Sequence, residues 1–391
     1  LSSNFTLSLK LVFIQKILIF AFWVMQNLKL YIVRRESRGI GGAEKVALRF
    51  MEAFSEYFHT EILDSDCLYR SGDAPTKPNG PGWLKAWRFA RDANRYISLR
   101  GQVLCLSMER GVVGDLYRFG DGVHKVWLKK RYKYSLAWKA NPLHWILPVM
   151  EKRSVIKSNS LVANSRMVAS EIKSHYKIDD GSLSVIRNGF DGNTFFFAGD
   201  ELRGKIKSEL NIPEDGHIKM LFSGSGWKRK GLDASIASLS HLQSTGVKAS
   251  LWVAGKGDSE PYRKRIDSLG LTNDVTFLGQ VTEIRKWYQA ADLMILPTSY
   301  DPFSNSCLEA LACGCPVLTT SSNGAAEVIT PENGLIVSSP GRCANEDAAK
   351  WVNRIKEMDR RKISLSVSGS LQESEIAQYL KILMKVSEKS E

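Results

Sequence analysis

The strongest constraint on the fold comes from one segment in the last third of the chain. An apolar run at 292–297 ends in a proline and leads into a polar loop, and a helical pattern follows from Cys307 to Ala312. Gly314 is placed to end that helix and Pro316 to begin another strand. In a parallel α/β sheet, such a strand, loop and helix put the loop at the carboxyl end of the sheet, where ligands bind.

The same segment carries two carboxylates, one in the loop and one in the helix that follows it. Asp301 leads the loop, and Glu309 follows eight positions later, about one turn inside the expected helix. Glu309 should therefore face the same crevice as the loop. Ser304 and Asn305 stand at the start of the helix, where free backbone amides attract phosphate. The segment thus predicts a binding site for a phosphorylated ligand.

A second segment, 219–232, reads as a strand, a glycine-rich turn and the start of a helix. It is not a P-loop, because its last glycine is followed by Leu232, and Arg229 replaces the third glycine of a dinucleotide-binding turn. Gly224 lets backbone approach a ligand closely, and Arg229 and Lys230 beside such a turn suit a diphosphate. The alternative from the residues alone is a basic, solvated helix start.

Two loops in the first half of the chain have similar character. An apolar strand that ends near Glu109-Arg110 is followed by a polar, glycine-spaced loop that contains Asp121 and His124. Near the start, a strand at 30–33 leads to the pair Gly41-Gly42 and then to a helix that runs to about residue 57. Loops of this kind after strands are typical walls of ligand sites. A structural histidine and a plain tight turn are the simpler interpretations.

Taken together, these motifs resemble a known family. Asp301-x7-Glu309, followed by A-x-A-x-G-x-P-V, is similar to the E-x7-E signature of retaining glycosyltransferases, the large family that includes sucrose, glycogen and lipopolysaccharide-core transferases. The first acid is an Asp here, one carbon shorter. Glu109-Arg110 with D-x-Y-R-x-G-D-G-x-H around Asp121 is closest to the lipopolysaccharide core glucosyltransferase subfamily.

The resemblance implies an α/β fold of the GT-B type, with two Rossmann-like domains facing a cleft. It implies retaining, metal-independent hexosyl transfer, with glucose from UDP-glucose moved onto a lipopolysaccharide-core-type acceptor and no cofactor besides the nucleotide-sugar donor. Arg229 and Lys230 would stabilise the departing diphosphate, Glu309 would hold the ribose, and Asp301 would hold a donor-sugar hydroxyl. The predicted catalytic residues are Asp121, His124, Arg229, Lys230 and Asp301. The predicted donor-binding residues are Gly41, Gly42, Gly224, Gly279, Ser304, Asn305 and Glu309.

The domain organisation follows from the alternation of strand and helix patterns, in which we expect helices near 83–97, 282–291, 305–313 and 343–358, among others. We expect residues 1–24 to be upstream sequence or an N-terminal extension, because Met25 leads directly into the first strand; a short membrane-surface helix is the alternative. The longest unbroken apolar run, 17–25, has only nine residues, too few to span a bilayer. An acceptor-side domain would cover 25–195 and a nucleotide-sugar domain 196–365, with 191–216 as a polar linker and lead-in. The tail, 366–391, has helical spacing, and the resemblance implies that it packs near the domain junction.

Charge divides the chain unevenly. Residues 1–190 carry 30 Lys and Arg against 16 Asp and Glu, whereas residues 191–391 carry 24 against 25. The basic half predicts an anionic partner, and we expect an anionic lipid-linked oligosaccharide acceptor at a peripheral membrane surface. The densest basic cluster is 125–133, for which a solvated helix face is an equal alternative. We therefore predict a cytoplasmic protein, peripheral to the inner membrane.

Other classes are less well supported by the sequence. The six cysteines show no metal-ligand spacing and fit a reducing compartment. The pair Asp64-x-Asp66 lies in the acceptor half, and we interpret it as a solvated strand edge. A nucleotide-sugar epimerase of the same fold is one alternative, against which the acidic motif speaks. A non-catalytic protein that binds anionic ligands is another, but no basic-aromatic motif predicts nucleic acid.

Overall fold

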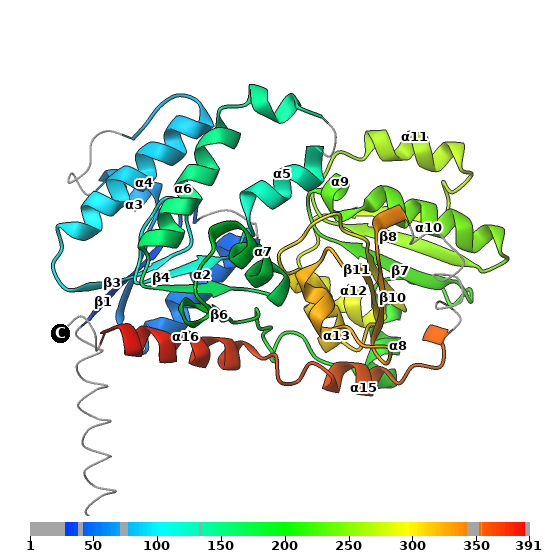
Figure 1. Ribbon diagram of the computed structural model, residues 1–391. Coiled ribbons are helices and arrows are strands. Elements are labelled where there is room, and N and C mark those ends of the chain that lie inside the picture. Colours follow the sequence, from blue (N-terminus) through cyan, green and yellow to red (C-terminus); the bar gives the residue numbers. More distant parts are fainter. Residues whose placement is uncertain are drawn as a thin grey trace, which may run out of the picture.

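The computed structural model describes residues 28–37, 42–70, 77–132, 135–341, 352 and 354–387. Within these residues the chain forms two parallel six-stranded sheets, each covered by helices on both faces (Figure 1). The first sheet is built from the first half of the chain and the second from the second half. The predicted α/β fold with two domains is therefore confirmed.

The first sheet has the strand order β2-β1-β3-β4-β5-β6. Its strands are β1 (Lys29–Val33), β2 (His59–Leu63), β3 (Val103–Ser107), β4 (Leu116–Phe119), β5 (Ser160–Ala163) and β6 (Leu183–Val185). Its helices are α2 (Gly42–Phe54), α3 (Ser65–Arg70), α4 (Gly82–Ser98), α5 (His124–Tyr132), α6 (Leu143–Lys157) and α7 (Arg166–Tyr176), with short 3-10 turns η1 (Ala137–Ala140) and η2 (Asp180–Ser182). The central strands β1 and β3 are buried except at their first residues, which explains their nearly continuous apolar runs.

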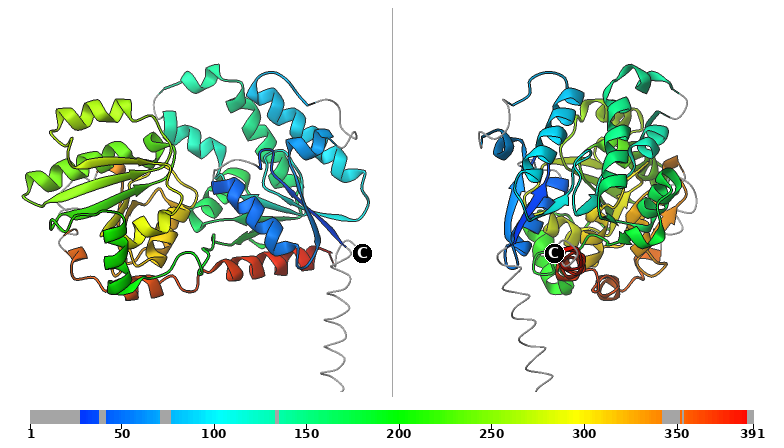
Figure 2. Two further views of the ribbon diagram at one scale, coloured as in Figure 1. Left: turned by 180° about the vertical axis from the view of Figure 1, so that it is seen from behind. Right: turned by 60° about the vertical axis from the view of Figure 1, so that its left-hand side comes forward.

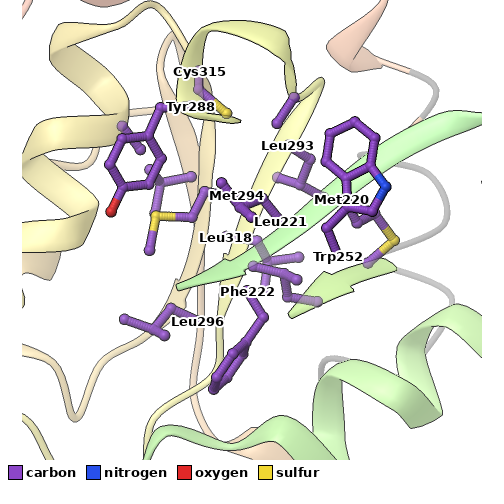
Figure 3. Packing of buried hydrophobic residues seen from close by; sticks show 14 of the residues in the cluster. Met220, Leu221, Phe222, Trp252, Tyr288, Leu293, Met294, Leu296, Cys315 and Leu318 are labelled. Carbon is purple, nitrogen blue, oxygen red and sulfur yellow. The ribbon is translucent and has the colours of Figure 1, made fainter. Parts of the chain in front are cut away.

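The second sheet has the order β12-β11-β10-β7-β8-β9, the doubly wound order of a Rossmann fold. Its strands are β7 (Ile218–Ser223), β8 (Ala249–Ala254), β9 (Val275–Gly279), β10 (Leu293–Leu296), β11 (Val317–Thr320) and β12 (Gly334–Val337). Its helices are α8 (Gly199–Glu209), α9 (Trp227–Lys230), α10 (Leu232–Ser244), α11 (Glu260–Ser268), α12 (Ile284–Ala290), α13 (Asn305–Ala312), η3 (Gly324–Val328) and α15 (Arg360–Leu365). Figure 3 shows the apolar core at this sheet, which includes Phe222, Met294 and Leu318.

Each sheet contains a point at which the strand order reverses. In the second sheet it lies between β7 and β10, and in the first it lies between β1 and β3. The loops that leave these strand pairs at their carboxyl ends diverge to opposite faces of the sheet and open a crevice, where ligands of such folds bind. The strand order thus brings the loop after β7 beside the loop after β10, and the loop after β1 beside the loop after β3.

The last helix, α16 (Gln372–Ser387), returns to the first sheet after the chain has completed the second (Figures 1 and 2). It packs against α2, where the rings of Phe50 and Tyr379 lie 4.8 Å apart between centroids. Glu375 on α16 accepts a hydrogen bond from the Gly189 amide (2.7 Å) and forms an ion pair with Arg49 of α2. The tail therefore ties the segment between the sheets to the first half of the chain.

Two local predictions are wrong. The stretch 191–216 is not only a linker, because it contains α8; this helix is largely polar, buries Ile206 and docks on α12 through Arg203. Asp64 is not on a solvated strand edge, because β2 ends at Leu63 and Asp64 is buried. Its carboxylate accepts from the Cys67 amide (2.7 Å) at the start of α3, which is a helix-capping role.

Two predictions fall outside the described residues. They are the extension 1–24 and most of the helix that we expected at 343–358. Among the residues that the structure describes, no helix combines the length and the apolar character needed to cross a bilayer.

Candidate functional site

Two cations meet one carboxylate at the reversal point of the second sheet. Arg229 and Lys230 lie on α9 after the glycine-rich turn, and Asp301 lies in the loop after β10. The Arg229 Nη1 is 3.1 Å and the Lys230 Nζ 3.6 Å from Oδ2 of Asp301, which is buried. Arg229 also donates to the Tyr300 carbonyl (2.8 Å). The cluster therefore keeps a net positive charge, which suits an anionic ligand group.

Gly224 makes this arrangement possible. Its φ is +139°, a conformation that side chains other than glycine rarely adopt, and a Cβ here would lie 2.8 Å from the Lys230 Nζ. The Lys230 side chain therefore lies directly across the turn. The predicted reason for a glycine at this position, the close approach of backbone to a ligand, stays a prediction.

Glu309 is held by a tyrosine that the sequence analysis missed. The Tyr288 hydroxyl lies 3.2 Å from Oε2 of Glu309 and 3.0 Å from Oγ of Ser223, at the end of β7. Burial raises the pKa of Glu309, while the bond from Tyr288 and the cations Lys45, Lys230 and Arg49 oppose that shift. Tyr288 lies within a helix that was predicted, but no local signal in the sequence pairs it with Glu309.

Hydrogen bonds within the protein already engage the Ser304 amide and the Asn305 side chain at the start of α13. The Ser304 amide donates to Oδ1 of Asn323 (3.2 Å), so it is not free for a phosphate. The Asn305 side chain accepts a hydrogen bond from Asn188 (2.6 Å), which lies in the segment between the sheets and in turn accepts from Arg118 (2.7 Å). A phosphate site at this helix terminus would therefore rest on Asn305 and the turn that follows.

The reversal point of the first sheet holds a second charged cluster, around Asp121. The Asp121 carboxylate is 3.0 Å from Nη1 of Arg34, directly after β1, and 3.7 Å from Nη1 of Arg110, after β3. Desolvation alone would raise the pKa of Asp121, but the two arginines outweigh it and hold that pKa well below its usual range. Arg110 is itself bound to the fully buried Glu151 (2.7 Å). Arg34 was missed, although its place directly after a strand is a usable signal.

His124 points into the first half of the chain. Its Nε2 lies 3.2 Å from Nδ1 of His144, and its backbone amide donates to Glu151. Burial lowers the pKa of His124 to about 3, and repulsion from the Arg110 guanidinium and from His144 adds to that shift. The His124 imidazole is therefore neutral at neutral pH. The ring nitrogen that reaches His144 is thus engaged in an internal contact, and the predicted role toward the reacting sugar stays a prediction.

The loops that carry the two clusters touch each other. A Cβ on Gly122, next to Asp121, would lie 2.2 Å from the Tyr300 hydroxyl, next to Asp301. That hydroxyl donates to Glu171 of α7 (2.7 Å), and Lys130 of α5 donates to Ser322 beyond β11 (3.0 Å). The two predicted acidic loops, distant in sequence, therefore line one interface between the halves.

The remaining predicted glycines divide into three cases. Gly42 is the first residue of α2 and is exposed, and Gly41 lies outside the described residues. Gly279 ends β9 with a φ of +65°, and a Cβ at this position would meet no atom of the described residues within 4 Å. In the described ranges, no group of three or more His, Cys, Asp or Glu side chains is placed to hold a metal ion.

The second half of the chain is similar in sequence to known glycosyltransferases. Residues 217–359 match the family model described as "Glycosyl transferases group 1", and this range includes Arg229, Lys230, Asp301 and Glu309. A glycosyltransferase of Methanocaldococcus jannaschii is 30% identical over 216 residues, which are 53% of each chain. A D-inositol 3-phosphate glycosyltransferase of Arthrobacter sp. is 28% identical over 217 residues, 53% of this chain and 49% of the relative. The chain spans about half the length of the curated relatives it matches.

Solved structures resemble the whole chain in fold. WaaG, a glycosyltransferase involved in lipopolysaccharide biosynthesis, aligns with a TM-score of 0.72 and 18% identity over 92% of this chain and 98% of its own. Sucrose-phosphate synthase from Thermosynechococcus elongatus aligns with a TM-score of 0.69 and 17% identity over 93% of this chain and 100% of its own. The fold is therefore the predicted GT-B arrangement, and residues 217–359 are similar to glycosyl transferases of group 1.

Proposed function

We propose that the protein is a retaining glycosyltransferase that moves a hexose, glucose from UDP-glucose, onto a lipopolysaccharide-core-type acceptor. One observation carries the proposal: Arg229 and Lys230 converge on Asp301 at the reversal point of the second sheet and leave an excess positive charge there. A group 1 match over the same residues supports it. So do the shared fold with WaaG and with the Anabaena protein HepE, whose structure in complex with UDP-glucose aligns with a TM-score of 0.62.

In this proposal, the second half binds the donor. The diphosphate would lie against Arg229 and Lys230, which stabilise its negative charge most as it departs. Glu309 would accept hydrogen bonds from the ribose hydroxyls, with its carboxylate oriented by Tyr288. Asp301, already held by the two cations, would accept from a hydroxyl of the donor sugar. The acceptor hydroxyl would attack the face of the sugar from which the diphosphate leaves, so that the anomeric configuration is retained.

The first half would bind the acceptor. Its cluster of Arg34, Arg110 and Asp121 adjoins the loop that touches Tyr300, beside the proposed donor site. The basic excess of residues 1–190 favours an anionic, lipid-linked acceptor, which implies a protein that works in the cytoplasm at the surface of the inner membrane. The domain boundaries at 195 and 365 remain part of this proposal.

The test has two parts. Calorimetric titration with a panel of nucleotide sugars should give the tightest binding for a UDP-hexose, and transfer to a phosphorylated core oligosaccharide should give a product whose anomeric configuration, read by NMR, matches that of the donor. Inverted configuration would overturn the retaining mechanism. Efficient transfer to a neutral soluble sugar, without preference for the phosphorylated acceptor, would overturn the acceptor class.

A further inference from the structure

Helix α6 exposes an apolar stripe that no part of the described chain covers. Trp145, Val149 and Ile156 leave 55%, 69% and 63% of their surface exposed. Their spacing of four and seven residues places them on one face of the helix. The preceding turn η1 adds Leu136, which is 65% exposed, and Trp138, whose ring lies 5.7 Å from that of Trp145. Apolar side chains of this size are seldom gathered on a surface without a partner.

The exposed charges on α4, η1 and α6 are all positive. Exposed cations on α4 recur at helical spacing, and others lie on η1 and α6; they are Lys85, Arg88, Arg91, Arg95, Lys139, Lys152, Arg153 and Lys157. The acids in the ranges 82–99 and 136–157 are Asp92 and Glu151, and both are buried in contacts within the protein. We call this surface, formed by α4, η1 and α6, the α4–α6 face.

Aromatic side chains at this face are arranged for an interface between water and an apolar phase. Trp87 on α4 is 44% exposed, and the Arg91 guanidinium lies 5.3 Å from its ring centroid. The Trp145 indole donates to the Lys139 carbonyl (2.8 Å), so its polar edge is satisfied while its rings stay exposed. Tryptophan and arginine together are typical of the headgroup region of a bilayer.

The face also lies beside the proposed acceptor site. Helix α6 packs against α5 and α4 (Figure 1), and α5 reaches the second half of the chain through Lys130 and Ser322. One member of the basic cluster predicted at 125–133 turns away from solvent, whereas Lys125, Lys129 and Arg131 are exposed. Lys130 faces the interface between the halves and lies 5.4 Å from the Tyr300 ring centroid, so it is not part of an outward-facing surface.

We propose that the α4–α6 face docks the protein onto the surface of an anionic phospholipid bilayer. The proposal rests on the proposed function, because a lipid-linked acceptor requires the cleft to sit near a membrane. The exposed cations complement anionic headgroups, and the apolar stripe of α6 enters the headgroup region. A protein partner or a second copy of the chain would instead need an acidic counterpart surface for these cations.

The test uses the full chain and co-sedimentation with vesicles made of equal parts phosphatidylglycerol and phosphatidylcholine. Two triple variants probe the face: Trp145→Ser, Val149→Ser, Ile156→Ser, and Lys152→Glu, Arg153→Glu, Lys157→Glu. We expect each to weaken binding by at least about tenfold, and added salt to weaken binding of the parent. Matched controls change exposed residues of the second half: Leu269→Ser with Leu365→Ser, and Lys205→Glu, Lys256→Glu, Lys264→Glu. These should bind as the parent does.

Several outcomes would overturn the docking surface. One is parent-like vesicle binding by both triple variants, because another segment of the chain would then bind the bilayer. Another is equal binding to pure phosphatidylcholine. A third is a parent that sediments as a dimer in the absence of lipid and a serine variant that sediments as a monomer, since the stripe would then be a protein interface. Calorimetry with UDP-glucose on the same variants separates this proposal from the proposed function. Vesicle binding without nucleotide-sugar binding would reject the enzyme and leave the docking surface standing.

Discussion

The two halves of the chain place charged clusters at equivalent points, but the clusters differ in balance. In the second half, Arg229 and Lys230 surround the single carboxylate of Asp301. In the first half, Arg34 and Arg110 are matched by Asp121 and by two further acids, Glu44 at 3.7 Å from Arg34 and Glu151 at 2.7 Å from Arg110. The net charges of the two halves show the opposite trend to the charges of their clusters. Residues 1–190 carry the basic excess, and residues 191–391 are nearly neutral.

The difference teaches that the net charge of a half does not predict the charge of its site. The nearly neutral half concentrates positive charge where a diphosphate would lie. The basic half surrounds the two arginines of its site with three carboxylates, so the site has no excess positive charge, as suits uncharged sugar hydroxyls, and it displays cations on its outer α4–α6 face. If this comparison is correct, substitutions at the two clusters should have different kinetic signatures.

The largest effect should come from the positive cluster. Arg229→Ala or Lys230→Ala removes a charge that acts most strongly as the diphosphate departs, so turnover should fall by roughly 10²–10³-fold. The measurement is steady-state transfer from UDP-glucose, and Lys228→Ala is the matched control because Lys228 is an exposed neighbour on the same helix. Parent-like turnover in both variants would mean that the cluster does not stabilise the leaving group.

A smaller effect should come from Glu309. Glu309→Gln keeps the shape but loses charge-assisted hydrogen bonds, so UDP binding should weaken by about 1.5–3 kcal/mol. Tyr288→Phe removes the hydroxyl that orients Glu309 and should cost about 1 kcal/mol. Calorimetric titration with UDP checks both values. The ribose assignment fails if UDP binds Glu309→Gln as tightly as the parent.

Next in size is the effect expected at the Asp121 cluster. Asp121→Asn leaves Arg34 and Arg110 without their shared carboxylate and should lower kcat/KM by about tenfold, the loss of roughly one charge-assisted hydrogen bond. UDP affinity should not change, because the donor nucleotide would lie on the other half. A variant with weakened UDP binding and normal turnover would reverse the comparison between the clusters.

The smallest effect concerns pH and stability. The folded pKa of His124, about 3, lies below the ordinary value of about 6.5, so the unfolded chain binds the extra proton in this range. The free energy of unfolding should therefore fall as pH drops from about 6.5 toward 3. His124→Gln should lose about 1 kcal/mol less than the parent between pH 7 and about pH 5.5, measured by denaturant unfolding. Equal losses would show that His124 is accessible to protons in the folded state.

Much of the local structure could be predicted because its causes are local. Apolar runs and helical spacing gave the helices at 83–97 and 305–313 close to the observed α4 (Gly82–Ser98) and α13 (Asn305–Ala312). The helix α8 was missed because it buries little apolar surface of its own and depends on contacts with α12. Asp64 was misread because capping depends on where the strand ends.

The sequence by itself determined which residues have chemistry to offer, because glycine-rich turns, paired cations and spaced carboxylates are written in adjacent positions. Only the tertiary structure decided which of them meet. Strand order places the loop after β7 beside the loop after β10, so Arg229 reaches Asp301 across 72 positions of sequence. Packing of α12 against α13 brings Tyr288 to Glu309, and the contact of the halves brings Gly122 to Tyr300. These pairings arise from burying apolar surface shared by distant segments, which no local pattern records.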